Sequence, residues 1–237
     1  MNEPYMMNNI AARGLFLGDY GEAIKQLEEA LKAVSLNISC NASYPEANFS
    51  VDKAEKSTPD SNLPFCKFFC PSSSSQFREV DRGDSRTKQY VFQSPIFVTE
   101  ALPMSDNSSY DKLSYIIVYN LGLAHHLQGL KSPSSKKCAS LLYKAQRLYE
   151  NSNMLLMKNS EILNFDPLNT MAILCNLGHI HSVLGSEETA QLCYQNLLSV
   201  LLYLVDCGHT SNTQYPLEGF FLNIMPIIAK PQGAPAA

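Results

Sequence analysis

The sequence lacks two features that would point to membranes or nucleic acids: a long apolar run and an excess of basic residues. Its 237 residues include 18 lysines and arginines against 22 aspartates and glutamates, for a formal net charge of -4. No apolar stretch reaches the roughly 18 residues of a transmembrane helix, and the amino terminus lacks the pattern of a signal peptide. Without a broad positive field, nucleic acids and anionic membranes are poor partners. We therefore expect a soluble intracellular protein, cytoplasmic or nuclear.

The motifs of common enzyme and metal sites are also missing. There is no glycine-rich phosphate loop, no Gly-x-Ser-x-Gly elbow and no His-Glu-x-x-His helix. The seven cysteines are odd in number, and four of them (Cys138, Cys175, Cys193 and Cys207) fall in helical patterns where cysteine acts as a small buried hydrophobe. Cys66 and Cys70 are a single pair of nearby cysteines without a second such pair, which is only a weak indication of a metal site. We expect no disulfide framework, no metal and no cofactor.

What the sequence does contain is a clear helical hairpin over residues 168–206. Apolar residues recur there every three or four positions, which predicts two amphipathic helices. Gly185 closes the first helix, and Glu187 and Glu188 favour the start of the second. The small residues Gly178 and Ala190 let the two backbones approach closely.

The pattern Leu177-Gly178, Gly185, Ala190, Tyr194 resembles a tetratricopeptide repeat, a unit of two helices. A second copy, broken by Gly18, covers residues 8–34. A third begins at residue 114, where Asn120-Leu121-Gly122 repeats Asn176-Leu177-Gly178. We align Cys138, Leu142 and Ala145 of that copy with Ala190, Tyr194 and Leu197.

The predicted fold is therefore a single all-α domain over residues 1–237. Three tetratricopeptide-like hairpins (4–36, 112–158 and 168–206) form a right-handed array, with a terminal helix at 217–229 and a loose tail at 231–237. Residues 38–111 are rich in Ser, Asn and Pro and are expected to be a disordered or loosely ordered insertion. Within it, residues 89–99 are rich in β-branched and aromatic types and are expected to be extended, as a short strand or hairpin.

The whole chain also resembles a family of uncharacterised diatom proteins. The resembling pieces are Tyr90-Val-Phe-Gln-Ser-Pro-Ile, Tyr119-Asn-Leu-Gly-Leu-Ala-His-His, Asn176-Leu-Gly-His-Ile-His, Leu204-Val-Asp-Cys-Gly and Ala234-Pro-Ala-Ala. This resemblance supports the fold and implies no activity.

In tetratricopeptide arrays the first helix of each pair lines a concave groove, and the resemblance places a set of residues on it. They are Asn8, Ala12, Leu15, Tyr119, Asn120, Leu123, His126, Cys175, Asn176, His179 and Ser182. The expected function is a non-catalytic scaffold or adaptor that binds a protein or peptide there. Family members that hold chaperone carboxyl-terminal tails use lysine, arginine and asparagine, and only Asn120 fits that pattern. Chaperone tails are therefore disfavoured as partners.

The groove raises a question about residues 90–99. The helix over residues 116–124 is apolar on nearly all sides, so something must cover its groove face. The extended segment is the nearest candidate. It either lies across the groove as a built-in occupant or patches the side of the core.

Two other functions stay open. Cys175 and His179 lie four residues apart on one helical face with His126 expected opposite, which permits a zinc site or a Cys-His nucleophile. A structural role is the stronger interpretation, because no carboxylate is placed in sequence to orient an imidazole. The remaining alternative is a structural subunit whose apolar helices are completed by another chain.

Overall fold

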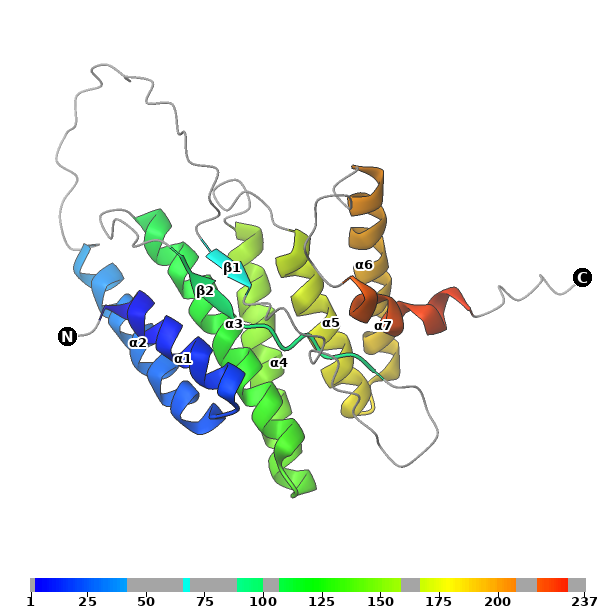
Figure 1. Ribbon diagram of the computed structural model, residues 1–237, viewed down its shortest axis with the longest axis horizontal. Helices are drawn as coiled ribbons and strands as arrows, with labels where there is room; N and C mark the ends of the chain where they lie inside the picture. The colour runs from blue at the N-terminus through cyan, green and yellow to red at the C-terminus, as the bar shows by residue number, and fades with distance from the viewer. Residues whose placement is uncertain are drawn as a thin grey trace, which may run out of the picture.

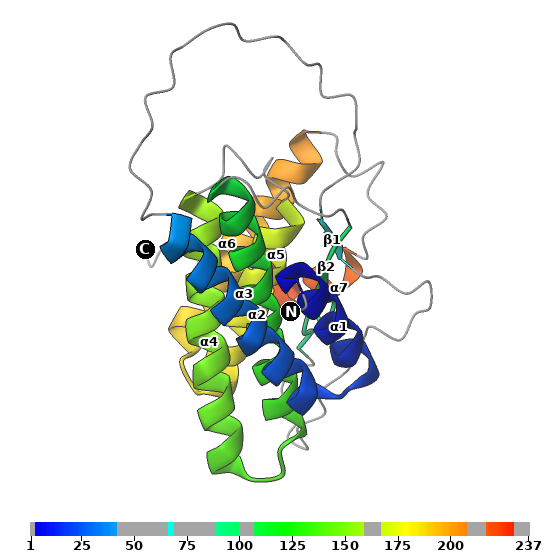
Figure 2. The same cartoon turned by 90° about the vertical axis from the view of Figure 1, so that its left-hand side faces the viewer.

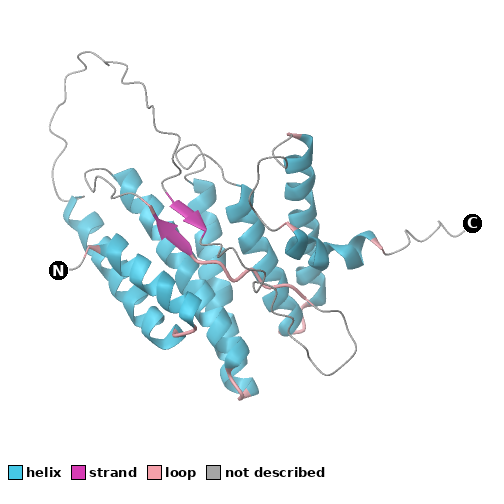
Figure 3. Ribbon diagram, viewed as in Figure 1, coloured by secondary structure: helices cyan, strands magenta, loops and turns pink. Residues whose placement is uncertain are grey.

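The computed structural model describes residues 3–41, 66–68, 89–99, 107–158, 167–207 and 217–229, and most of these are helical, as predicted (Figure 3). The helices are α1 (Pro4–Leu17), α2 (Tyr20–Asn41), α3 (Asn107–Lys131), α4 (Ser135–Lys158), α5 (Pro167–Val183), α6 (Glu187–Asp206) and α7 (Glu218–Ile228). Two short strands, β1 (Cys66–Phe68) and β2 (Ile96–Val98), complete the described elements.

Consecutive helices pack in pairs, α1 on α2, α3 on α4 and α5 on α6, and α7 packs on α6 and α5 (Figure 1). Glycines make the tight connections in the first and third pairs. Gly18 and Gly185 both have positive φ, near 83° and 82°, a conformation that L side chains rarely adopt. Both helix ends predicted at these glycines are confirmed.

Within two of the pairs, a glycine of the first helix lies against a tyrosine of the second. A Cβ added at Gly178 would come within 2.4 Å of the Tyr194 ring, and one at Gly122 would come within 3.2 Å of the Tyr149 ring. The close approach predicted at Gly178 is therefore confirmed. The alignment of Leu142 with Tyr194 is wrong, because Tyr149 takes that place. The repeated glycine contact therefore aligns Gly122 with Gly178 and Tyr149 with Tyr194. The helices α3 and α4 are longer than α5 and α6.

The helices differ sharply in how much of their surface is buried. Every residue of α3 from Tyr115 to Leu127 is buried, as its apolar sequence predicted. On α4, only a single stripe including Leu142, Ala145 and Tyr149 is buried. In Figure 2, α1 and α7 lie on the side of the strands, and α2 and α4 lie on the other side. We call the face made by α1, α3, α5 and α7 the inner face.

Residues 89–99, here called the inner segment, cross the inner face in an extended conformation (Figure 1). The segment thus covers α3, as predicted; that the covered face is a binding groove stays a prediction. The segment does not fold into a hairpin on itself. Its strand β2 pairs antiparallel with β1, with Phe68 opposite Ile96. Cys66 therefore begins a strand instead of belonging to an irregular loop, and Cys70 lies outside the described residues.

Several predicted boundaries are displaced. α2 runs to Asn41 and α3 begins at Asn107, so the helices extend into the expected insertion, 38–111, from both sides. At the second boundary, Tyr110 and Leu113 are buried and continue the apolar stripe of α3 by one turn, which the polar residues around them conceal in the sequence. The terminal helix predicted at 217–229 is confirmed as α7. The tail 231–237 lies outside the described residues.

Among the described residues, no helix combines the length and apolar character needed to cross a membrane. Among the cysteines whose side chains the structure describes, Cys138, Cys175, Cys193 and Cys207 are free thiols. Only Cys175 is fully buried. Cys207 is exposed, contrary to the prediction, because it caps the end of α6 and does not lie on the helix's packed face.

Candidate functional site

Four asparagines hold the main chain of the inner segment. Each side-chain amide donates a hydrogen bond to the carbonyl of one residue and accepts one from the N–H of that same residue. The pairs are Asn223 with Tyr90, Asn176 with Phe92, Asn120 with Ile96, and Asn9 with Val98, at donor–acceptor distances of 2.8 to 3.0 Å. We call Asn9, Asn120, Asn176 and Asn223 the clamp asparagines.

Each clamp asparagine comes from a different helix of the inner face, in the order α1, α3, α5 and α7. An asparagine suits this task because its amide has both donors and an acceptor, so one side chain satisfies both polar groups of a buried residue. Asn8 supports the arrangement: it donates to the Ile96 carbonyl at 3.2 Å and accepts from Asn120 at 2.9 Å.

The bound residues follow a strict alternation. In an extended chain, the N–H and C=O of every second residue point to the same side. Residues 90, 92, 96 and 98 turn theirs to the clamp asparagines. At the β2 end, the opposite edge of the strand pairs with β1. The amides of α1 and α3 thus take the position that a neighbouring strand would occupy.

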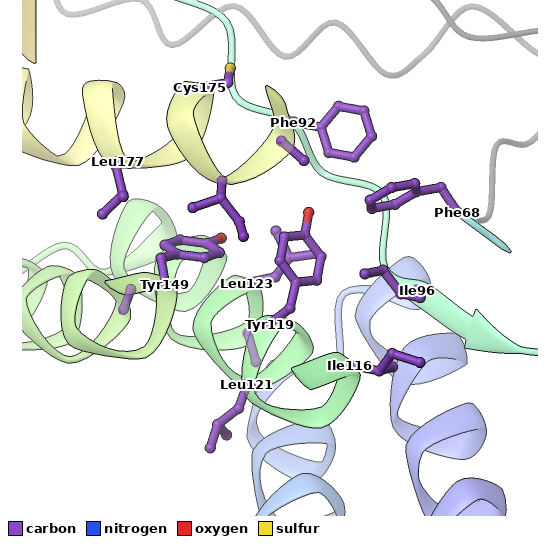
Figure 4. Close-up of a cluster of buried hydrophobic side chains, with 14 of the residues drawn as sticks. Phe68, Phe92, Ile96, Ile116, Tyr119, Leu121, Leu123, Tyr149, Cys175 and Leu177 are labelled. Carbon is purple, nitrogen blue, oxygen red and sulfur yellow. The ribbon is translucent and has the colours of Figure 1, made fainter. Parts of the chain in front are cut away.

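Most side chains of the inner segment are buried, and Gln89, Gln93, Phe97 and Thr99 are the more accessible ones. Phe92 is fully buried, stacks on Phe220 of α7 at 5.3 Å and meets Phe68 of β1 edge-on at 5.0 Å. Tyr90 meets Phe220 edge-on. Figure 4 shows Phe92 and Ile96 among side chains of α3, α4 and α5. The inner segment is therefore part of the hydrophobic core.

Beneath the segment lies a buried polar cluster that joins α3, α4 and α5. His126 Nε2 is 3.0 Å from His179 Nδ1, and the Tyr149 hydroxyl is 3.5 Å from the other ring nitrogen of His126. Asn176 also donates to the Tyr149 hydroxyl, at 3.0 Å. Burial, with a smaller contribution from His179, holds the pKa of His126 well below 6.5. His126 is therefore neutral at physiological pH.

Cys175 is placed with the segment. Its thiol lies 3.5 Å from the Tyr90 carbonyl and accepts from Asn223 at 3.2 Å. Burial raises the pKa of this thiol to about 12, so it stays protonated, whereas a nucleophile or a metal ligand must be a thiolate. Within the described residues, no three His, Cys, Asp or Glu side chains are grouped to hold a metal ion.

The other residues predicted for the groove fall into two groups. Ala12, Leu15 and Leu123 are buried core residues. Tyr119 and Ser182 contact the segment: the Tyr119 hydroxyl donates to the Ser94 carbonyl at 3.4 Å, and Gln89 donates to the Ser182 hydroxyl at 2.8 Å.

Two clamp asparagines, Asn9 and Asn223, were not among the predicted site residues. Asn223 lies in an apolar helix that was interpreted only as a cap. A lone amide in such a helix is itself a signal, because a buried polar group needs partners. Asn9 follows Asn8, and the helical period alone gives no reason to choose between them.

Comparison with known proteins finds no relative of this chain. No model of a protein family matches the chain, and neither the curated proteins nor the solved structures include a match.

Proposed function

We propose that this protein is a non-catalytic interaction protein, a scaffold or adaptor built from tetratricopeptide-like hairpins in a right-handed array. The pairwise packing of α1 to α6 supports this fold, as does the glycine-on-tyrosine contact that recurs in the pairs α3–α4 and α5–α6. In this proposal the inner face is the groove of the array, and its ligand is an extended chain.

The observation that carries the proposal is the paired hydrogen bonding by the clamp asparagines. Four amides, each from a different helix, are aligned along one line and satisfy both polar groups of every residue they meet. Apolar packing alone would leave these buried N–H and C=O groups without partners. A row of matched backbone contacts is the means by which proteins bind extended peptides.

The chemistry of the inner face also favours binding over catalysis. The groups that hold the segment are neutral amides, hydroxyls, a protonated thiol and aromatic rings, none of them activated. A neutral face offers nothing to a carboxylate or a phosphate, so chaperone tails, nucleic acids and membranes remain disfavoured partners in this proposal. A cytoplasmic or nuclear location accords with such a role.

Affinity capture from native lysate tests the proposal. The intact chain is compared with a chain carrying Asn120→Ala and Asn176→Ala, and with the matched control Asn196→Ala, whose asparagine is exposed on α6. Folding of each variant is checked by circular dichroism. A partner retained by the intact chain and the control but lost from the double variant supports binding at the inner face. A partner retained by all three places the interaction on the outer helices, and the absence of any specific partner contradicts the proposal.

A structural subunit is the second candidate, favoured by one observation. α7 exposes Phe221, Leu222, Met225 and Ile228, each more than two fifths accessible. Exposed apolar side chains gathered on one helix are typical of an interface. Light scattering over a range of concentrations tests this candidate. A concentration-dependent oligomer that Phe221→Ser and Met225→Ser abolish would favour it over the adaptor.

A further inference from the structure

The inner segment shows which chemistry the inner face accepts. We propose that the inner face also binds an extended segment of another protein in trans, in the place that residues 89–99 occupy, with the inner segment as a resident competitor. This inference rests on the interaction function proposed above and specifies its ligand.

The clamp asparagines recognise the main chain, which every extended peptide shares. Any residue except proline offers the N–H and C=O that Asn9, Asn120, Asn176 and Asn223 contact. The contacts also define a spacing. Residues 90 and 92 are bound, residues 93–95 form a gap, and residues 96 and 98 are bound. In the gap, the Ser94 carbonyl accepts a long hydrogen bond, 3.4 Å, from the Tyr119 hydroxyl and meets no clamp asparagine. Proline is accepted at the next position, where Pro95 stands, because no clamp asparagine needs its N–H.

The side-chain sites narrow the ligand further. A Cβ added at Gly219 would come within 2.4 Å of the Tyr90 ring. Because glycine has no side chain, Gly219 leaves room for an aromatic ring at this position of the ligand. Phe92 lies between Phe68 and Phe220, and Ile96 and Val98 are buried at the other end. Val91 is also fully buried, so the expected ligand is an uncharged, extended peptide of the pattern aromatic-aliphatic-aromatic-x-x-Pro-aliphatic-x-aliphatic.

Replacement of the inner segment by a partner peptide can begin at the β2 end of the segment. The β2 end of the inner segment is its least enclosed part, because Phe97 is half-buried and Thr99 is exposed. Beside it lies an open pocket of about 560 Å³, lined by Asn9, Arg13, Phe16, Leu17 and residues 97–99. A tethered competitor acts at an effective concentration of roughly millimolar. A partner therefore needs either a better match to the sites or prior loosening of the resident segment.

The test uses the full chain and a fluorescent peptide of residues 89–99, with binding measured by anisotropy. In the variant Phe92→Asp, a charge at a fully buried site expels the resident segment and leaves the clamp asparagines intact. Thr99→Asp, at an exposed position of the same segment, is the matched control. We expect the Phe92→Asp chain to bind the peptide at least about tenfold more tightly than the wild type and the control. Adding Asn176→Ala to that variant should weaken binding about thirtyfold or more, as expected for the loss of two hydrogen bonds to buried groups.

A second measurement keeps the test decisive if Phe92→Asp fails to fold. The wild-type chain is photolysed with excess peptide that carries a photoreactive phenylalanine at the position of Phe92, and the products are mapped by mass spectrometry. Crosslinks to α5 or α7 support exchange. A folded Phe92→Asp chain that leaves the peptide unbound, or a wild-type chain without such crosslinks, overturns it.

Two further outcomes are informative. If tagged wild-type chain captures untagged wild-type chain but neither the peptide nor an untagged Phe92→Asp chain, the occupant is the segment of a second copy, and the inference is overturned. Failure of peptide binding leaves the interaction function standing, because affinity capture by the intact chain does not depend on this peptide. Failure of both experiments removes both.

Discussion

The neighbouring helices α3 and α4 show two ways in which a sequence secures a helix. α4 is amphipathic: one stripe packs on α3 and the rest meets water. α3 is buried on every side from Tyr115 to Leu127, because α1, α2 and α4 pack on it and the inner segment crosses it at Tyr119 and Asn120. A helix that is apolar all round therefore indicates a missing cover, which this chain supplies from residues 89–99, shortly before the helix in the sequence.

The largest test of this contrast is the removal of the main apolar anchor of the cover. Phe92→Ala should lower the free energy of unfolding by about 3–5 kcal/mol, the usual result of truncating a fully buried aromatic side chain. On the outer face, Tyr143→Ala should change it by no more than about 0.5 kcal/mol, because Tyr143 is 56% exposed. Urea titration followed by circular dichroism measures both. Similar losses in the two variants would contradict the role of the inner segment as a cover.

Asparagine provides a matched pair of substitutions on the two faces. Asn176→Ala removes both hydrogen bonds to Phe92, so the buried C=O loses its amide donor and the N–H keeps only the weak acceptor Cys175. Since each unsatisfied group costs about 1–3 kcal/mol, we expect a loss of about 2–4 kcal/mol. Asn196→Ala, on the exposed face of α6, should be neutral or slightly stabilising. Equal thermal midpoints for the two variants would show that water replaces the clamp at no cost.

Glycine gives a smaller contrast of the same kind. Gly178→Ala should cost about 1–3 kcal/mol, because the added Cβ meets the Tyr194 ring at 2.4 Å and forces the two helices apart. A Cβ on Gly21, at the start of α2, meets nothing within 4 Å, so Gly21→Ala should stabilise the protein by a few tenths of a kcal/mol. Differential scanning calorimetry distinguishes the two. Stabilisation by Gly178→Ala would mean that the helices do not approach as closely as described.

The sequence predicts those parts of the molecule that depend on local pattern. Helical periodicity and the turn glycines Gly18 and Gly185 locate the helices, and the apolar helix over residues 116–124 indicates that a cover is needed. Contacts between residues that are far apart in the sequence produce no local pattern from which they could be predicted. Nothing near Cys66 shows that it begins a strand paired with residue 98, and nothing near Asn223 shows that its partner is Tyr90. Half of the clamp was therefore predictable and half was not.

Burial gives His126, on the inner face, a lower pKa than an exposed histidine has. Because burial holds the pKa of His126 well below 6.5, the folded protein keeps this ring neutral under conditions in which the unfolded chain takes up a proton. Above pH 6.5 both states are neutral and stability is complete. As the pH falls below 6.5, only the unfolded state gains the proton, so stability is lost.

The smallest expected effect is thus a pH dependence that arises inside the core. As the pH falls below 6.5, His126 should lower the free energy of unfolding with a slope of at most about 1.4 kcal/mol per pH unit. His126→Phe, which keeps a ring but cannot be protonated, should remove that part of the slope. The remaining slope should come from groups such as His125, whose pKa burial also lowers. Urea titrations at several pH values measure both proteins. An unchanged slope in His126→Phe would mean that the imidazole takes up its proton within the folded state, next to His179, and that the inner face is less dry than its burial indicates.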